Sequence, residues 1–285
     1  MMEKTLLLIG CGQLGAALGQ HFLAKGWRVV GARRNIAALP PGFEALPLDF
    51  RAPQTFAGLR DVAADYVLVT LTPGARSAEA YKAVFELGFE GVLQALNTSA
   101  LKRVLFASST SVYHHNDGSV VDENSELAPT SYSGRSVLAA EQLLQASGLP
   151  ATVVRFGGIY GGESLRLAER VRAGQCAPLE PPHFSNRIHR DDCVGVLRHV
   201  LEQSEAGAAV AGCYLAVDND PAPIAEVHQW LAQQLGVPYQ VDHGYRHMAG
   251  SKRGSNQRLR DSGYEFAYPD YRVGYAEVLA RAPEG

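Results

Sequence analysis

Residues 6–15 read LLLIGCGQLG, and this stretch decides the fold. A short apolar run leads into GCGQLG (residues 10–15), which has the spacing GxGxxG, and a segment with helical spacing follows and stops at Gly26. The first glycine permits a tight turn, the second lets the backbone approach a pyrophosphate, and the third allows close helix–strand packing. The helix N-terminus offers free N–H groups and a partial positive charge to phosphates. The stretch predicts a dinucleotide-binding turn; the alternative is a tight turn without a ligand.

Short apolar runs continue to alternate with helical patterns after this turn. This alternation predicts an α/β fold, a doubly wound parallel sheet of the Rossmann type. The expected strands are residues 6–9, 27–32, 44–50, 66–71, 103–107, 151–156 and 213–217, and the expected helices are residues 14–25, 77–96, 134–146, 194–201 and 224–235. We expect a dinucleotide-binding domain over residues 1–156, completed by roughly 188–218. Residues 157–187, with a proline-rich loop at 177–183, and residues 219–285 would form a smaller C-terminal substrate-binding region.

The second expected strand ends in Arg33-Arg34, where a site for NAD usually carries an acid about 20 residues after the glycines. Guanidinium groups suit a 2′-phosphate, so the sequence favours NADP over NAD. The alternative is that both arginines lie on a solvated strand end. Asp49, at the end of the third strand, could accept from the adenine amino group or cap the next helix. The predicted cofactor-binding residues are Gly10, Gly12, Gln13, Leu14, Gly15, Arg33, Arg34, Asp49, Thr70, Leu71 and Thr72.

Bulk composition narrows the class of protein. The formal charge is −3, with 26 basic and 29 acidic residues, so neither nucleic acid nor a membrane surface is an expected partner. The apolar N-terminal run is too short for a signal peptide or a membrane span. The four cysteines form no CxxC, which favours buried free thiols in a cytoplasmic protein. No tight histidine and carboxylate spacing predicts a metal.

Further motifs identify a family resemblance. SSTSVY (residues 108–113), RFGGIYG (155–161), IHRDDCV (188–194) and the segment 255–269 make the chain resemble the extended short-chain dehydrogenase/reductases that act as NAD-dependent epimerases and dehydratases on nucleotide sugars. The resemblance implies a small-molecule substrate, in particular a nucleotide-linked sugar, and a homodimer by analogy. The spacing GxG departs from the GxxGxxG of many members and indicates an atypical branch.

The resemblance also implies a catalytic tyrosine and a lysine four residues later on one helix. The ammonium favours the phenolate and lowers a phenol pKa that is otherwise about 10. Residues 130–144 read TSYSGRSVLAAEQLL. The family motif can be aligned with this run in two registers. In one, Tyr132 is the tyrosine and the lysine position holds Ser136. In the other, which matches the flanking residues better, Ser133 replaces the tyrosine and Val137 replaces the lysine. Both registers lack the lysine, so the usual proton transfer is expected to be absent.

Candidate catalytic residues remain near that helix. Ser109, on the fifth strand, stands where the family steadies the substrate oxygen, and Tyr132 or Ser133 would take part in any residual proton transfer. Two functions stay open: an NADP(H)-linked reductase, epimerase or dehydratase with an altered active site, or a non-catalytic NADP(H)-binding or sensing module. A different Rossmann enzyme, such as an imino- or hydroxyacid dehydrogenase, fits residues 108–113 and 133–141 less well.

Several other polar residues are weaker candidates. A histidine of the pair His114 and His115 could exchange protons at neutral pH. The remaining ones are Arg135 and Arg155 as substitute cations, Asp191 and Asp192 as helix caps, Arg187 and Arg190 toward a phosphorylated substrate, His243 and His247 on a surface loop, and Arg253, Arg258 and Arg260 as an anion patch or a solvated face.

Overall fold

The computed structural model describes residues 3–162, 164–247 and 250–281. The chain divides into two compact units, each made of several segments. Unit 1 comprises residues 1–112, 127–155 and 196–214, and unit 2 comprises residues 113–126, 156–195 and 215–285.

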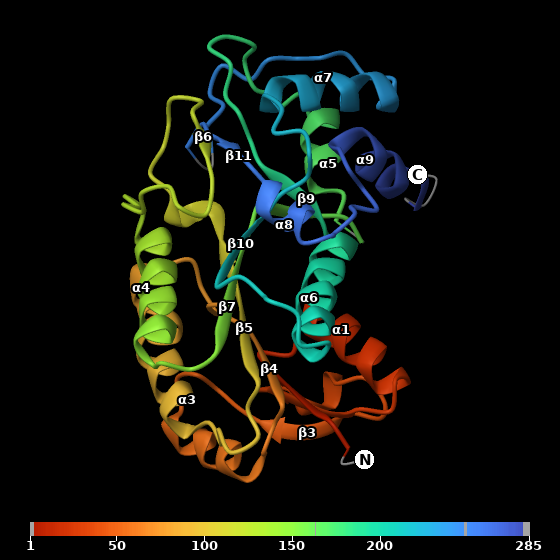
Figure 1. Cartoon of the computed structure of the whole chain (residues 1–285). Helices are drawn as coiled ribbons and strands as arrows, with labels where there is room; N and C mark the ends of the chain where they lie inside the picture. Colours follow the sequence, from red (N-terminus) through yellow and green to blue (C-terminus); the bar gives the residue numbers. More distant parts are fainter. Residues whose placement is uncertain (1–2, 163, 248–249, 282–285) are drawn as a thin grey trace. The chain divides into compact units, whose positions relative to one another are not determined.

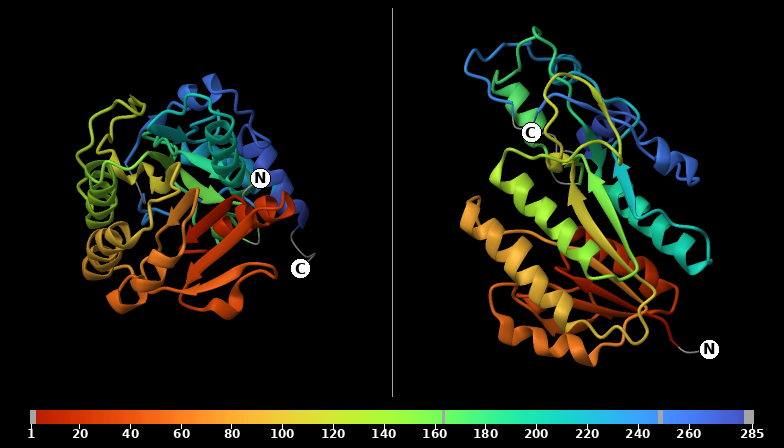
Figure 2. Two further views of the ribbon diagram at one scale, coloured as in Figure 1. Left: turned by 60° about the horizontal axis from the view of Figure 1, so that its bottom comes forward. Right: turned by 60° about the vertical axis from the view of Figure 1, so that its left-hand side comes forward.

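A seven-stranded sheet forms the centre of unit 1 (Figures 1 and 2). Its strands run in the order β10-β7-β5-β4-β1-β2-β3, and β1 pairs in parallel with both β2 and β4. The bounds are β1 (Thr5–Ile9), β2 (Arg28–Arg33), β3 (Glu44–Pro47), β4 (Tyr66–Thr70), β5 (Arg103–Ser109), β7 (Ala151–Phe156) and β10 (Cys213–Ala216). This order is that of a Rossmann sheet, whose direction of strand addition reverses between β1 and β4. The predicted fold class is confirmed.

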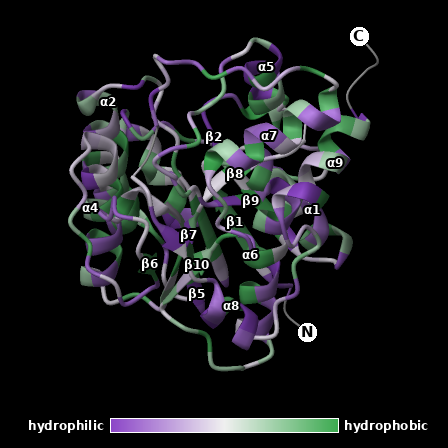
Figure 3. Ribbon diagram, turned by 90° about the horizontal axis from the view of Figure 1, so that it is seen from above, coloured by the Kyte–Doolittle hydropathy of each residue, from purple (hydrophilic) through white to green (hydrophobic). Residues whose placement is uncertain are grey.

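Helices cover both faces of this sheet, as its nearly continuous apolar strands require. Helices α3 (Phe89–Ala95) and α4 (Tyr132–Ala146) lie on one face, and α1 (Gln13–Ala24) and the later part of α6 (Arg190–Glu205) lie on the other (Figure 1). Hydrophobic and hydrophilic residues alternate along α4 (Figure 3), as expected of a helix with one buried face. The sheet buries the whole of β1, with Leu6–Ile9 at 0% exposure.

Some expected elements differ from the observed ones. The expected helix 77–96 consists of three parts: α2 (Ala78–Lys82), a π-helical segment (Ala83–Gly88) and α3. The Ser77 side chain caps the start of α2 by accepting from the Ala80 N–H. The third strand ends at Pro47 rather than at residue 50. The Leu48 N–H still donates to the Arg33 carbonyl, and the chain then turns at Asp49, whose carbonyl accepts from the Ala52 N–H. The helix expected at 194–201 begins at Arg190 and is longer. Among the described residues, no helix has the length and apolar character needed to cross a bilayer.

Unit 2 contains two small parallel ladders and several helices. Strand β8 (Gly158–Tyr160) pairs with β9 (Arg187–His189), and β6 (Val120–Val121) pairs with β11 (Arg253–Gly254). The helices are α5 (Arg166–Arg172), α7 (Ile224–Leu235), α8 (Gln257–Asp261) and α9 (Tyr271–Arg281). Apolar residues from α5, α7 and α9 share one core, which includes Val171, Leu231 and Tyr275. The sequence pattern of residues 251–271 gave no prediction of β11 or α8.

Candidate functional site

The glycine turn of unit 1 adopts the conformation that its sequence predicts. Gly10 has φ +78°, and a Cβ at this position would overlap the carbonyl oxygen of Thr70. Thr70 Oγ1 donates a hydrogen bond to the Gly10 carbonyl at 2.6 Å, and the N–H groups of Gly10 and Cys11 donate to the Ala32 carbonyl. The turn is therefore held between the ends of β2 and β4, and only glycine fits at its first position.

Helix α1 begins directly after this turn. Gly12 is its N-cap residue, and no side chain caps it. The first N–H groups of a helix have no partner within the helix, so the amides of Gln13, Leu14 and Gly15 are left to bind an anion or water. No acidic residue stands in the first turn. This end of α1 is thus a site suited to phosphate.

A cavity of about 370 Å³ opens beside the turn, within unit 1. Predicted cofactor-binding residues contribute much of its lining: Gly10, Gly12, Arg33, Arg34, Asp49, Thr70 and Thr72. Gln13, Leu14, Gly15 and Leu71, although predicted, are not among its described lining residues. The sequence reasoning missed others that line the cavity, namely Cys11, Asn35, Leu48, Phe50, Arg51, Gly74 and Val84.

The charges of this cavity are mainly positive. Arg33 donates to the Ala38 carbonyl at 3.3 Å, and Arg34 lies near enough to help lower the pKa of Asp49. The Asp49 carboxylate is paired with Arg51 at 2.8 Å, and this arginine is the main reason why the pKa of Asp49 falls to about 2. The N-cap of the following 3₁₀ helix (Pro53–Asp61) is Ala52. The interpretation of Asp49 as a helix cap is therefore wrong, because its oxygens accept from Arg51.

Cys11 lies within the turn and is 1% exposed. Burial raises the pKa of its thiol to about 11, an effect that Arg33 only partly opposes. A protonated thiol is a weak nucleophile, so Cys11 acts here as a small apolar residue. None of the four cysteines forms a disulfide; Cys213 is half-buried, and the other three are buried as expected.

The helix with the expected catalytic residues is α4. Ser131 caps it by accepting from the Gly134 N–H at 3.0 Å, and Ser133 Oγ lies 3.2 Å from Ser131 Oγ. Tyr132 is 37% exposed, and its ring meets the edge of Tyr81 at a centroid distance of 5.4 Å. Val137 is 5% exposed. No lysine stands on this helix.

Two neighbouring hydrogen bonds fix the surroundings of α4. Ser109 Oγ, at the end of β5, accepts from the Ser111 N–H at 3.1 Å. Ser136 Oγ donates to Glu86 Oε1 at 2.9 Å. Gly134 permits close approach of α4 to the Ser111 carbonyl, which a Cβ would overlap. These contacts position the start of α4 against the end of β5.

A buried ion pair connects α4 to the sheet. Glu141 binds Arg155 of β7 at 2.7 Å, with both side chains 7% exposed, and also accepts from the Ser108 hydroxyl of β5. The suggestion that Arg155 could act as a substitute cation for catalysis is disfavoured, because its guanidinium is already neutralised by Glu141. Arg135 is exposed and donates to the Thr130 carbonyl.

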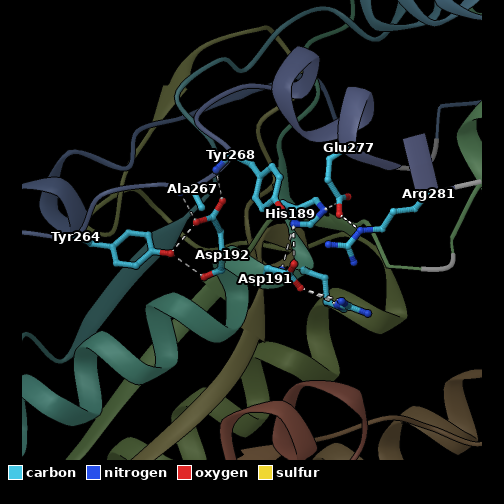
Figure 4. Close-up of polar contacts among 9 residues, drawn as sticks. His189, Asp191, Asp192, Tyr264, Ala267, Tyr268, Glu277 and Arg281 are labelled. Carbon is cyan, nitrogen blue, oxygen red and sulfur yellow. Dashed lines mark hydrogen bonds and ion pairs between the residues drawn. The ribbon is translucent and has the colours of Figure 1, made fainter. Parts of the chain in front are cut away.

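Unit 2 uses the start of α6 to hold a distant loop (Figure 4). Asp192 is 1% exposed and accepts from Tyr264 Oη at 2.7 Å and from the N–H groups of Ala267 and Tyr268 at 2.9 Å each. Asp191 instead pairs with Arg190 at 2.9 Å. Asp191 and Asp192 were expected to cap the helix, but α6 already begins at Arg190, and the Asp192 carboxylate bonds the 264–268 loop.

His189 lies beside the same loop. Its ring packs against that of Tyr268 at a tilt of 34°, with the ring centroids 3.7 Å apart. Its Nε2 is 3.4 Å from Glu277 Oε2 of α9 (Figure 4). Burial lowers the pKa of His189, while nearby Asp191 and Glu277 oppose this effect. The neutral imidazole is thus favoured by desolvation.

The other basic candidates of unit 2 are mostly engaged by main-chain groups. Arg187 is 5% exposed, and its guanidinium donates to the carbonyls of Asp220 and Ser185. Its hydrogen bonds therefore connect loops, and they leave little of the guanidinium for a phosphate. Arg253 donates to the Gly118 carbonyl at 2.8 Å. Arg258 contacts Asn124 and Glu123, Arg260 contacts Asn256 and Gln257, and His247 stacks on His183 at 3.6 Å. Within the described residues, no group of three or more histidine, cysteine or acidic side chains could hold a metal ion.

A Rossmann sheet with a glycine turn at the N-terminus of its first helix defines a protein of the dinucleotide-binding class. The sequence profile described as the NAD dependent epimerase/dehydratase family matches residues 6–209. The chain therefore belongs to the NAD-dependent epimerase/dehydratase family, and the resemblance found in the sequence is confirmed.

Individual relatives extend along nearly the whole chain. "Protein YeeZ" of Escherichia coli K12 is 29% identical over 279 residues, which are 94% of this chain and 97% of YeeZ. A solved structure from Methylobacillus flagellatus, described as a candidate NAD-dependent epimerase/dehydratase, is 31% identical and covers 98% of both chains with a TM-score of 0.81. MoeE5, solved in complex with UDP-glucose and NAD, is 22% identical with a TM-score of 0.77 over 97% of both chains, a likeness of fold.

Proposed function

We propose that this chain binds a pyridine dinucleotide, with NADP(H) preferred over NAD(H), in the cavity beside the glycine turn. The observation that carries the proposal is the set of groups at that cavity: the glycine turn, the uncapped amides at the start of α1, and three arginines (Arg33, Arg34 and Arg51). The one acidic residue that lines the cavity, Asp49, is already paired with Arg51. These groups fit a dinucleotide. The turn and the start of α1 would hold the pyrophosphate, and the arginines would hold the adenosine end. When bound, the nicotinamide supplies hydride transfer.

The preference for NADP(H) follows from charge. An acid that could accept from a ribose hydroxyl is absent at the end of β2, where Arg33 and Arg34 stand. A 2′-phosphate would bring negative charge to guanidinium groups that donate in a planar fork. A hydrogen bond to a charged group is typically worth about 1.5–3 kcal/mol, so the two arginines together should favour NADPH over NADH at least ten-fold.

Titration of the full-length protein with NADPH and NADH, followed by nicotinamide fluorescence, tests this proposal. Arg34→Ala and the double change of Arg33 and Arg34 to Ala should weaken NADPH ten-fold or more and leave NADH within about two-fold. Arg198→Ala, on the exposed side of α6, is the matched control and should change neither. If NADH binds wild type more tightly than NADPH, the argument from the arginines fails. If neither binds, the dinucleotide site itself is refuted.

We further propose an epimerase-, dehydratase- or reductase-like protein with an altered proton-transfer site, acting on a nucleotide-linked sugar that residues 157–187 and 219–285 would bind. Ser133 and Val137 cannot supply the phenol and ammonium of the usual pair. Tyr132 is then the remaining candidate acid or base, with Ser109 to steady the substrate oxygen. The likeness of fold to MoeE5, which was solved with UDP-glucose and NAD, supports UDP-glucose as the first probe.

A second candidate function is non-catalytic NADP(H) binding or sensing. The observation in its favour is Tyr132, which packs against Tyr81 and is 37% exposed. Tyr132→Phe distinguishes the two functions. In a functioning active site it should lower turnover of UDP-glucose with NADP⁺ about 10²-fold or more without changing the affinity for NADPH. A wild-type protein that binds NADPH but turns over no nucleotide sugar supports the sensor. Ser133→Tyr combined with Val137→Lys then asks whether the usual pair restores activity.

The proposal also includes a cytoplasmic homodimer. Four cysteines without a disulfide suit a reducing compartment. Light scattering of the purified protein measures its mass in solution, and a monomer at micromolar concentration would contradict this part.

A further inference from the structure

Arg51 and Asp49 form an ion pair whose two members both line the cavity beside the glycine turn. Arg51 Nε donates to Asp49 Oδ1 at 3.1 Å, and Arg51 Nη2 donates to Asp49 Oδ2 at 2.8 Å, which is the bidentate geometry of arginine with a carboxylate. The Arg51 main-chain N–H also donates to Oδ1, at 3.0 Å. The remaining N–H groups of the guanidinium stay available to water or to a ligand.

This pair is exposed to solvent and is therefore easy to break. The Arg51 side chain is 53% exposed and that of Asp49 is 25% exposed. Ion pairs in contact with water contribute little to stability, because water and salt screen them and both side chains lose freedom. Arg51 is also the main reason why the pKa of Asp49 is about 2, so the carboxylate is charged at neutral pH. Any other anion in the cavity must compete with this carboxylate for the guanidinium.

The charges around the pair favour a phosphate as that competitor. Among the described residues that line the cavity, Arg33, Arg34 and Arg51 are positive and Asp49 is the one acid. Arg34 is close enough to Asp49 to help lower its pKa, so at least two of the three guanidinium groups lie near this carboxylate. A phosphate that binds to the arginines is therefore attracted by three charges and opposed by one.

The sequence offered another role for Asp49, as an acceptor for the adenine amino group. The carboxylate already accepts three hydrogen bonds from Arg51, and two of them converge on Oδ1. An adenine acceptor would also favour NADPH and NADH equally, because the base is the same in both coenzymes. Competition for Arg51 would instead act on the coenzyme with the 2′-phosphate alone, so the two roles make different predictions.

We propose that Asp49 competes with the 2′-phosphate of NADP(H) for the Arg51 guanidinium. Arg51 is then a third residue that distinguishes NADP(H) from NAD(H), and Asp49 is a positioning residue that limits this preference through Arg51. The 2′-phosphate replaces the carboxylate as the partner of Arg51, whereas NAD(H) leaves the ion pair intact. This inference deepens the proposed function and rests on it for the identity of the ligand.

Fluorescence titration of the full-length protein with NADPH and NADH tests the competition. Asp49→Asn keeps the shape of the side chain and removes its charge, so it should strengthen NADPH binding about two- to five-fold. Arg51→Met should weaken NADPH binding about ten-fold. Both variants should leave NADH binding within about two-fold of wild type. In the Arg51→Met background, Asp49→Asn should add less than about two-fold, because the residue through which it acts is gone.

A matched control stands at the other end of the same strands. Arg28, at the start of β2, and Glu44, at the start of β3, form an exposed bidentate pair, with Arg28 Nε donating to Glu44 Oε1 at 2.7 Å. Neither residue is among the described residues that line the cavity. Glu44→Gln and Arg28→Met make the same changes of charge as the test variants, and they should change the binding of either coenzyme less than two-fold.

Several outcomes would overturn the inference. Equal weakening of NADPH and NADH by Asp49→Asn would assign Asp49 to the adenine base. A gain for NADPH that is as large in Glu44→Gln, or that persists in the Arg51→Met background, would be a general effect of charge. If NADPH binds and Arg51→Met leaves the ratio of the two affinities unchanged, this inference fails and the dinucleotide site stands. If neither coenzyme binds wild type, the proposed function fails and this inference fails with it.

An NMR measurement on wild type gives a second readout that does not depend on the stability of the variants. The protein is labelled with ¹⁵N-arginine, and the Arg51 Nε resonance is identified as the one absent from Arg51→Met. Adenosine 2′,5′-bisphosphate should shift this resonance, because its 2′-phosphate takes Arg51 from Asp49. Adenosine 5′-monophosphate, which lacks that phosphate, should leave it in place. The same shift with both probes would refute the exchange of partners.

Discussion

Replacing Gly10 with alanine tests whether the turn of unit 1 depends on its backbone conformation and on its closeness to β4. Gly26, at the other end of α1, is a matched control within the same unit. Both glycines have nearly the same φ, +78° at Gly10 and +77° at Gly26. They differ in their surroundings: a Cβ at Gly10 overlaps the Thr70 carbonyl oxygen and lies 3.1 Å from its carbon, whereas nothing lies within 4 Å at Gly26.

The expected losses can be worked from these two features. A left-handed conformation costs a residue other than glycine about 1–2 kcal/mol, and both variants bear this cost. Forcing an extra carbon into a packed site adds about 1–3 kcal/mol, and only Gly10→Ala bears that. The free energy of unfolding should therefore fall by about 1–2 kcal/mol in Gly26→Ala and by about 2–5 kcal/mol in Gly10→Ala.

Urea denaturation followed by circular dichroism measures both variants against wild type, and NADPH titration gives a second readout. Gly10→Ala should weaken NADPH at least ten-fold, because the turn amides must move away from the phosphates, whereas Gly26→Ala should bind normally. Equal destabilisation of the two variants would show that the overlap with Thr70 is relieved without cost. Normal NADPH binding by Gly10→Ala would refute the role of this turn.

Three further changes probe buried charges and one close helix contact, two of them in unit 1 and one in unit 2. Glu141→Gln should lower the free energy of unfolding by about 3–5 kcal/mol, because it leaves the charge of Arg155 buried and uncompensated. The double variant Glu141→Leu with Arg155→Met should regain much of this lost stability in urea denaturation. A double variant no more stable than Glu141→Gln would contradict the reasoning. Gly134→Ala should destabilise α4 despite the higher helix propensity of alanine, since its Cβ meets the Ser111 carbonyl; a gain of about 1 kcal/mol in the same assay would mean that the helix shifts freely. Burial raises the pKa of Asp218 from its usual acidic range to about 7, so the free energy of unfolding falls as pH rises from about 4 to about 7. Asp218→Asn removes this titration and should reduce the pH dependence of the free energy of unfolding by up to about 4 kcal/mol. Parallel stability–pH curves for wild type and variant would contradict this prediction.

The sequence predicted the strands and the glycine turn because their signals are local. Gly10 has a positive φ, and this requirement for glycine arises within one strand–turn–helix unit, whereas its close contact with Thr70 of β4 does not. The alternation of apolar runs predicted the sheet, since each strand of a covered parallel sheet is buried on both faces. Ends of elements were less predictable: β3 ends at Pro47 rather than at residue 50, and α6 begins at Arg190 rather than at residue 194.

Residues whose role depends on distant contacts could not be found in this way. Arg51 enters the cavity because β3 ends beside β2 and its own guanidinium pairs with Asp49. Asp192 stands at a helix start, where a capping role is the ordinary expectation, yet its partners lie 72 to 76 residues later in the chain. Lys252 is buried although it stands in the polar run SKRGSN, where nothing in the local pattern indicates burial. Side-chain partners of this kind are fixed by tertiary packing alone.

Binding of a dinucleotide and proton transfer place different demands on a chain of this family. The first depends on main-chain amides and on glycines that allow close approach, all of which are present here. The second depends on two side chains of one helix, and in the register that we propose those positions hold Ser133 and Val137. Val137 is 5% exposed, so a lysine there would have to bring its ammonium into a packed face, whereas valine fills the same space without a charge. The α4 packing is thus compatible with loss of the pair, and cofactor affinity can persist where turnover does not. For this reason NADPH affinity and turnover in Tyr132→Phe must be measured separately.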